Sequence, residues 1–224
     1  MSEAVPQPAV LPPRDFGTEL VLVRHGQSAD VVPGSPDSED PPLSDLGHAQ
    51  AQALAARLAP KSIDAVIASD LRRAVETAGY LAEPRHLPVE QRPDLQEVHL
   101  GDWGSGEFRR RAAVRDPEWQ RFAAAGRWDL VPGSEGDDVF RHRVKRAVDE
   151  ETARHAGKSI AIVVHGGVIN AYLAETFGIE RSFFASIENT SLTILRASGD
   201  RRLLVTVNDC THLYDPALAS APAG

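Results

Sequence analysis

Apolar positions follow two patterns along the chain, short continuous runs and a spacing of three or four residues. Short runs rich in β-branched and other apolar residues predict strands over 18–23, 63–68, 160–164, 191–196 and 203–208. Such runs, when apolar on both faces, are typical of strands inside a parallel sheet that is covered on both sides. Apolar residues spaced three or four apart predict helices over 49–58, 71–81, 137–155 and 168–177. Ser44 is expected to cap the first helix, and Ser69 or Asp70 the second.

Strands that alternate with helices predict the fold class. We expect a single α/β domain over 18–213, with three α/β/α layers and a central, mostly parallel sheet. The proline-rich segment 1–17 is expected to be a flexible leader, and 214–224 a flexible tail. The middle region, 84–136, shows no regular period, so no elements are assigned there.

Polar residues follow the predicted strands directly. Arg24, His25 and Gly26 follow the first strand, and His165 and Gly166 follow the strand over 160–164. In open α/β sheets, ligands bind beyond the carboxyl ends of the strands. The two histidines are 165 − 25 = 140 residues apart, yet we expect them to be neighbours at one edge of the sheet.

Composition and charge exclude several classes of protein. The chain has 224 residues, with 24 Lys and Arg against 32 Asp and Glu, and no basic run, which disfavours binding to nucleic acid or to an anionic membrane. No apolar run approaches the roughly 18 residues of a membrane span, and no secretory signal pattern is present. Cys210 is the single cysteine, which excludes an intramolecular disulfide and a cysteine-built zinc site. A cytoplasmic protein is expected.

The strand-end residues favour phosphoryl chemistry. A metal site is disfavoured because Arg24 places a cation beside His25 and no His-Glu-x-x-His spacing occurs. A serine hydrolase is disfavoured because Gly-Ser-Gly at 104–106 is too short for a nucleophile elbow. A neutral imidazole is a competent nucleophile toward phosphorus, and arginine and helix N-termini suit phosphate oxygens.

These residues also carry a family resemblance. Segment 22–28, Leu-Val-Arg-His-Gly-Gln-Ser, is similar to the signature of the histidine phosphatase superfamily, which includes phosphoglycerate mutases. Further segments resemble other motifs of the family, in the family's order, at 42–51, 69–78, 95–103, 132–135 and 163–167. The resemblance covers roughly 18–213 and implies the phosphoglycerate mutase-like fold.

The resemblance implies a role for each candidate site residue. His25 is implied to be the phosphorylated nucleophile, and Glu97 the general acid that protonates the leaving oxygen and then activates water. Arg24, Arg73 and His165 are implied to hold the phosphoryl oxygens as part of the catalytic set. The expected contacts of the substrate phosphate are Arg24, Gly26, Gln27, Arg73, His165, Gly166 and Asn189. The resemblance implies no metal and no cofactor.

Departures from the mutase pattern favour a phosphatase. Val31 stands where mutases carry a phosphate-binding asparagine, and the middle region lacks their paired basic residues. The arginines 109–111 are interpreted as a solvated helix face. We therefore expect a metal-independent phosphoric monoester hydrolase that acts on a small phosphorylated molecule. A 2,3-bisphosphoglycerate-dependent phosphoglycerate mutase and a non-catalytic phospholigand-binding protein stay open, as does a homodimer, since dimers occur in the family.

We also interpret two short segments, 37–40 and 102–103. The acidic segment 37–40 follows the nucleophile, so we hypothesise that it borders the pocket and discourages polyanionic substrates by like-charge repulsion. Asp102 and Trp103 are interpreted as packing residues rather than as substrate contacts.

Overall fold

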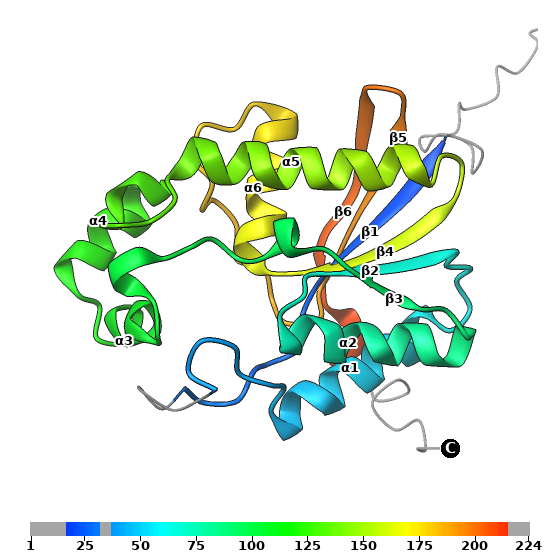
Figure 1. Ribbon diagram of the computed structural model, residues 1–224, viewed down its shortest axis with the longest axis horizontal. Helices are drawn as coiled ribbons and strands as arrows, with labels where there is room; N and C mark the ends of the chain where they lie inside the picture. Colours follow the sequence, from blue (N-terminus) through cyan, green and yellow to red (C-terminus); the bar gives the residue numbers. More distant parts are fainter. Residues whose placement is uncertain (1–16, 32–36, 215–224) are drawn as a thin grey trace, which may run out of the picture.

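The computed structural model describes residues 17–31 and 37–214 (Figure 1). Its six strands form one sheet in the order β3-β2-β4-β1-β5-β6. β5 is antiparallel to β1 and to β6, whereas β1 is parallel to β4, and β2 to both β4 and β3. The predicted mostly parallel sheet is thus confirmed. The strands are β1 (Thr18–Arg24), β2 (Ala65–Ala68), β3 (Val89–Gln91), β4 (Ser159–Val164), β5 (Leu192–Ser198) and β6 (Arg201–Asp209).

Helices cover both faces of the sheet, as the three-layer prediction requires (Figure 1). Along β1, Leu20 and Leu22 pack into one hydrophobic cluster with α5 (Asp137–Arg154) and α6 (Gly166–Phe177). Val21 and Val23 point to the opposite face and pack with α1 (Asp45–Leu58) and α2 (Arg72–Ala82). This alternation buries β1 on both faces, which explains its continuous apolar sequence. None of the helices in the described residues combines the length and the apolar character that a bilayer crossing requires.

The helix starts agree with the predicted caps only in part. Ser44 is the N-cap of α1, and its side chain accepts the N–H of Gly47. The predicted Asp70 cap of α2 is wrong, because its carboxylate accepts the side-chain amide of Gln96 instead. The first N–H of α2, at Arg72, donates to a carboxylate from a distant loop described below. The predicted leader, 1–17, and tail, 214–224, lie outside the described residues apart from Gly17 and Tyr214.

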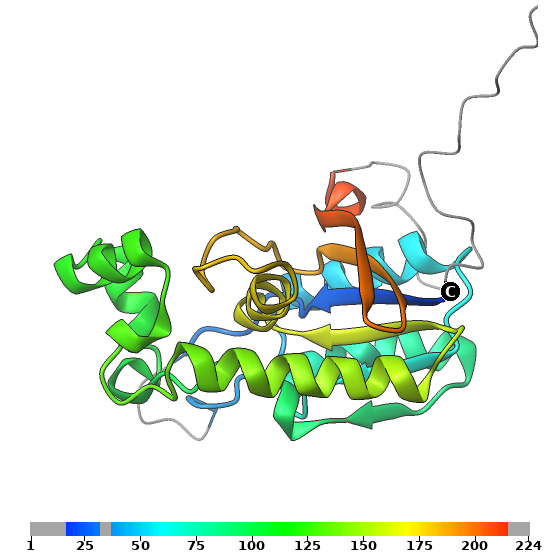
Figure 2. The same ribbon diagram turned by 90° about the horizontal axis from the view of Figure 1, so that it is seen from above.

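The middle region forms a cap beside the sheet. Two short helices, α3 (Glu107–Ala113) and α4 (Pro117–Ala125), lie to one side of the sheet in both views (Figures 1 and 2). We call residues 101–134 the cap. Its interior is aromatic, with Phe122 4.7 Å from Trp128 and 5.6 Å from Phe108, between ring centroids. α3 has only seven residues, so sequence periodicity could not reveal it.

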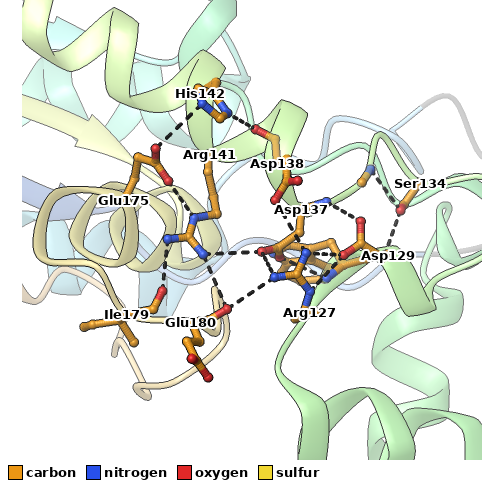
Figure 3. A network of polar contacts seen from close by, with 12 residues as sticks. Arg127, Asp129, Ser134, Asp137, Asp138, Arg141, His142, Glu175, Ile179 and Glu180 are labelled. Atoms are coloured by element: carbon orange, nitrogen blue, oxygen red, sulfur yellow. Dashed lines mark hydrogen bonds and ion pairs between the residues drawn. The ribbon is translucent and has the colours of Figure 1, made fainter.

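A buried carboxylate fastens the cap to the helices α5 and α6 (Figure 3). Asp137 is 0% exposed, and its Oδ1 accepts the backbone N–H of Trp128 at 3.1 Å. Its Oδ2 lies 3.6 Å from a guanidinium nitrogen of Arg127 and 3.6 Å from one of Arg141. Arg141 also donates to Glu175 of α6 at 2.9 Å. We call this group of residues the Asp137 junction.

Candidate active site

A cavity of about 420 Å³ opens at the carboxyl ends of β1 and β2. Arg24 pairs with Val164 in the β1–β4 ladder, so the residues that follow these two strands are neighbours. The ring centroids of His25 and His165 lie 5.0 Å apart. Side chains from β1, α2 and the connecting segments line the cavity, among them Arg24, His25, Arg73, Glu97 and Asn189. The structure thus brings together residues that are far apart in the sequence.

The hydrogen bonds of His25 define its tautomer. Nδ1 lies 2.6 Å from the carbonyl oxygen of Gly26, and because a carbonyl only accepts, Nδ1 carries the proton. Nε2 therefore keeps its lone pair, which accepts a hydrogen bond from Nε of Arg73 at 3.3 Å. Burial, and then the guanidinium groups of Arg73 and Arg24, hold the pKa of His25 well below 6.5. The result is a neutral imidazole whose unprotonated Nε2 faces the guanidinium of Arg73.

His165 has the opposite tautomer. Its Nδ1 lies 3.4 Å from Nη2 of Arg73, and since a guanidinium only donates, Nδ1 is the acceptor. Nε2 therefore carries the proton and donates to the hydroxyl of Ser69 at 2.9 Å. Burial, followed by the nearby His25 and Arg73, holds the pKa of His165 well below 6.5 as well. Ser69 thus orients His165, a role that its position at the end of β2 did not reveal.

Arg24 has unused hydrogen-bonding capacity in the site. Its Nη1 donates to the carbonyl oxygen of Ile187, whereas its buried Nε has no acceptor among the described residues. Burial lowers the pKa of Arg24, and the carboxylate of Glu97 opposes that shift. Gly166 lies against this guanidinium, since a Cβ built there would be 3.6 Å from Nε of Arg24. Gly166 also opens α6, so its N–H is a helix N-terminal donor.

Glu97 is held by backbone donors on two sides. Its Oε2 accepts the N–H of Gly167, and its Oε1 that of Val98, both at 3.0 Å. A Cβ at Gly167 would lie only 2.2 Å from Oε1 of Glu97, so a larger residue there would displace this carboxylate. Glu97 lines the cavity, where it can reach the leaving group of a bound phosphate ester.

Three further residues, Asn189, Gln27 and Gly26, are predicted phosphate contacts, and their positions relative to the cavity differ. Asn189 lines the cavity, and its side-chain amide donates to the carbonyl oxygen of His25 at 2.9 Å. Gln27 also lines the wall, where its side-chain oxygen accepts the hydroxyl of Ser44. The N–H of Gly26 donates to the hydroxyl of Thr77 at 3.0 Å, and its contact with phosphate stays a prediction.

Arg109, which was interpreted as part of a solvated helix face, belongs to the cavity wall. It lines the cavity, and its Nη2 donates to the hydroxyl of Ser28 at 2.8 Å. Its neighbours Arg110 and Arg111 pair with Glu107 at 2.7 and 2.6 Å, and the guanidinium of Arg111 also lies 5.1 Å from the ring centroid of Trp103. The solvated-face interpretation is therefore right for Arg110, whose side chain is 59% exposed, and wrong for Arg109, which lines the cavity, and for Arg111, whose side chain is only 21% exposed.

The acidic segment 37–40 borders the cavity in part, and Asp37 is not among the lining residues. Ser38 and Glu39 line its wall, and Asp40 lies 3.5 Å from Nη1 of Arg73. Trp103 is 2% exposed within the hydrophobic cluster that includes α5, as its interpretation as a packing residue requires, and its ring also contributes to the cavity wall.

Together these groups form a centre suited to phosphoryl transfer. A neutral imidazole nitrogen faces fixed guanidinium donors, and a carboxylate lies on the cavity wall. Fixed donors of this kind stabilise the charge that develops on the transferring phosphoryl oxygens. Within the described ranges, no group of three or more His, Cys, Asp or Glu side chains is arranged to hold a metal ion.

Comparison with known proteins agrees with this chemistry. The metal-independent phosphoserine phosphatase of Arabidopsis thaliana is 31% identical over 205 residues, which are 88% of this chain and 83% of that protein. The phosphoglycerate mutase-like protein 4 of the same plant is 33% identical over 215 residues, 92% of this chain and 91% of that protein. The solved structure of a mycobacterial glucosyl-3-phosphoglycerate phosphatase in complex with VO3 has a TM-score of 0.71 at 29% identity, covering 85% of this chain and 98% of that one. The model of the histidine phosphatase superfamily (branch 1) matches residues 20–210. The chain therefore belongs to branch 1 of the histidine phosphatase superfamily.

Proposed function

We propose that this protein is a phosphatase that hydrolyses phosphomonoesters through a phosphohistidine on His25. The observation that carries the proposal is the neutral state of His25. Its Nε2 accepts a hydrogen bond from Arg73, and the guanidinium of Arg24 is also nearby. A nucleophile in that state needs no base to activate it.

The first step transfers the phosphoryl group to the protein. Nε2 of His25 forms a bond to phosphorus while the bond from phosphorus to the leaving oxygen breaks. That oxygen takes the proton of the Glu97 carboxyl group and departs as an alcohol. Arg24 and Arg73 donate to the phosphoryl oxygens throughout, and we assign His165 to the same group of phosphate contacts.

The second step returns the protein to its starting state. A water molecule attacks phosphorus, and its proton passes to the carboxylate of Glu97. The bond between phosphorus and Nε2 of His25 breaks, which restores the lone pair of the imidazole and releases inorganic phosphate. Asn189 keeps the backbone of His25 in place through its hydrogen bond to the carbonyl oxygen of that residue.

Arg109 indicates the kind of leaving group. It is a cation on the cavity wall, held by Ser28, and the described residues provide no ion-pair partner for it. We therefore propose a small substrate that carries an anionic group beside its phosphate. The names of two relatives, phosphoserine phosphatase and glucosyl-3-phosphoglycerate phosphatase, denote substrates that have such a carboxylate.

Phosphate release from a panel of monophosphates, with EDTA present, tests the proposal. We expect the wild type to release phosphate, to accumulate an acid-labile phosphoenzyme on rapid quenching, and to lose both properties in His25→Ala. Release that persists in His25→Ala, or that requires a divalent cation, would contradict the mechanism. If no monophosphate is hydrolysed, activity in a 2,3-bisphosphoglycerate-primed assay would favour the mutase alternative.

We further propose that the protein is cytoplasmic and that it forms a homodimer. A cytoplasmic location and the absence of nucleic-acid and membrane partners are supported by the acidic composition without basic runs and by the single cysteine. Cell fractionation and sedimentation of the purified protein test the location and the homodimer.

A further inference from the structure

Asp40 gives the phosphate-binding Arg73 a resident counter-ion. Its Oδ1 lies 3.5 Å from Nη1 of Arg73, whose side chain is only 11% exposed. Three arginines line the cavity, and this is the single ion pair that the described residues provide for them. Each nitrogen of Arg73 thus has its own partner: Nε faces His25, Nη2 faces His165 and Nη1 faces Asp40.

The position of Asp40 is fixed independently of Arg73. Its two carboxylate oxygens accept the N–H of Arg72 at 2.9 and 3.1 Å. This N–H belongs to the first residue of α2, a helix whose N-cap, Leu71, makes no side-chain capping bond. Asp40 therefore supplies the missing cap from another segment, which is a favourable place for a carboxylate. The neighbouring Asp37 ties the same segment to the side chain of Arg72 at 2.6 Å.

Resting on the proposed function, we infer that Asp40 competes with phosphate for Arg73 and thereby speeds release of the product. A phosphate dianion bound to Arg73 lies close to a second negative charge that is held in place by α2. Like charges that share one cation repel each other, so the bound phosphate is less stable than it would be without Asp40. When phosphate leaves, Asp40 again balances the charge of the buried guanidinium.

A purely structural role for Asp40 would have the opposite signature. If Asp40 served only to hold Arg73 in position, its loss would weaken phosphate binding. Arg73 is, however, also held by the ring nitrogens of His25 and His165, so it keeps its place when Asp40 is neutralised. The charge effect then dominates, and phosphate binding tightens.

Binding of inorganic phosphate, measured by isothermal titration calorimetry, tests the inference without relying on turnover. Asp40→Asn removes the charge but keeps an oxygen for the N–H of Arg72. We expect its Kd for phosphate to fall by about three- to tenfold, the range for a partly exposed charge pair. The Ki for phosphate and the KM should fall with it. Asp37→Asn, in the same segment but not in contact with Arg73, is the matched control and should leave all three constants unchanged.

Two further variants make the test decisive. Asp40→Glu restores a carboxylate and should return the Kd toward the wild-type value, whereas Asp40→Ser removes the charge with a smaller side chain and should tighten binding as Asp40→Asn does. An unchanged or weakened affinity in the charge-free variants would overturn the inference while leaving the phosphatase proposal intact. Absence of phosphate binding in the wild type would overturn both.

Discussion

Two clusters of arginine side chains, one in the Asp137 junction and one in the cavity, differ in how their charges are balanced. In the Asp137 junction, Arg127 and Arg141 share one fully buried carboxylate, and Glu175 takes a further donor of Arg141. In the cavity, Asp40 forms the single ion pair described, and a buried nitrogen of Arg24 has no acceptor among the described residues.

The difference separates a structural cluster from a binding cluster. Buried charges are stable when partners compensate them, and the Asp137 junction contains those partners. Three arginines and three carboxylates, those of Asp30, Glu39 and Glu97, line the cavity, but among the described residues only Arg73 of these arginines has an ion pair, with Asp40, so we expect a bound anion to compensate Arg24 and Arg109. Charges of the first kind should affect stability when changed, and charges of the second kind should affect activity.

The largest effect is expected at the Asp137 junction. Asp137→Ala leaves two arginines without their shared buried carboxylate, and we expect the free energy of unfolding to fall by about 3–5 kcal/mol. Urea denaturation measures this. Asp138→Ala is the control, because Asp138 is the next residue of α5 but its side chain is 79% exposed and it pairs with Arg127 at 3.5 Å. Equal losses of unfolding free energy in Asp137→Ala and Asp138→Ala would show that the buried carboxylate is not what stabilises the junction.

Arg73→Gln should show the converse behaviour. We expect kcat/KM to fall by about 10²–10³-fold, the usual cost of removing one donor to the transition state, while the free energy of unfolding changes little. Steady-state kinetics and urea denaturation of the same preparation measure both quantities. A loss of stability comparable to that of Asp137→Ala would show that the two clusters do not differ as proposed.

Glu97→Gln tests whether the carboxyl group of Glu97 acts as the general acid. For an alkyl phosphate we expect about a 10²-fold loss of kcat, because the poor leaving group needs a proton. For p-nitrophenyl phosphate the loss in the first step should be much smaller, and a pre-steady-state burst of nitrophenol should persist. Losses of equal size in the bursts of both substrates would rule out the acid role.

Arg109→Gln tests the cation at the leaving-group end. For phosphoserine we expect KM to rise about tenfold, since a hydrogen bond to a charged group is lost. For p-nitrophenyl phosphate KM should barely change. Arg110→Gln is the matched control on the same helix, because Arg110 pairs with Glu107 and does not line the cavity. A rise in KM for both substrates would assign Arg109 to the phosphate itself.

The smallest effect concerns pH. His25 stays neutral in the folded chain below pH 6.5, because its pKa is held well below that value, whereas the unfolded chain takes up a proton there. Stability contributed by this neutral state is present above pH 6.5 and is lost as the pH falls below it. In His25→Gln, the fall in unfolding free energy between pH 7.5 and 5.5 should be smaller than in the wild type by up to about 1.4 kcal/mol.

The sequence predicted the parts of the fold that follow from periodicity. The apolar runs at β1 and β4 placed His25 and His165 at one sheet edge, which the 5.0 Å separation of their rings reproduces. The cap was missed because α3 and α4 are short and their buried side chains are aromatic rather than periodic.

The parts of the site that escaped prediction depend on side-chain direction. Three consecutive arginines, 109–111, point in different directions around α3, and only the positions of Ser28 and Glu107 decide which of them faces the cavity. The contact between Asp40 and Arg73 joins two segments that no local pattern relates. Such pairings come from tertiary structure, so a single sequence does not reveal them.

The place of β1 in the sheet also sets the order in which the protein can be made. β1 pairs with β4 and β5, and Glu19 meets Ser159 and Arg196, which are 159 − 19 = 140 and 196 − 19 = 177 residues later. During synthesis the apolar strand that precedes His25 therefore stays unpaired until most of the chain has left the ribosome. Unpaired apolar strands are sites of aggregation. Chains that stop before β4 should accordingly be inactive and insoluble. The site can form only after β4 and β5 have been synthesised.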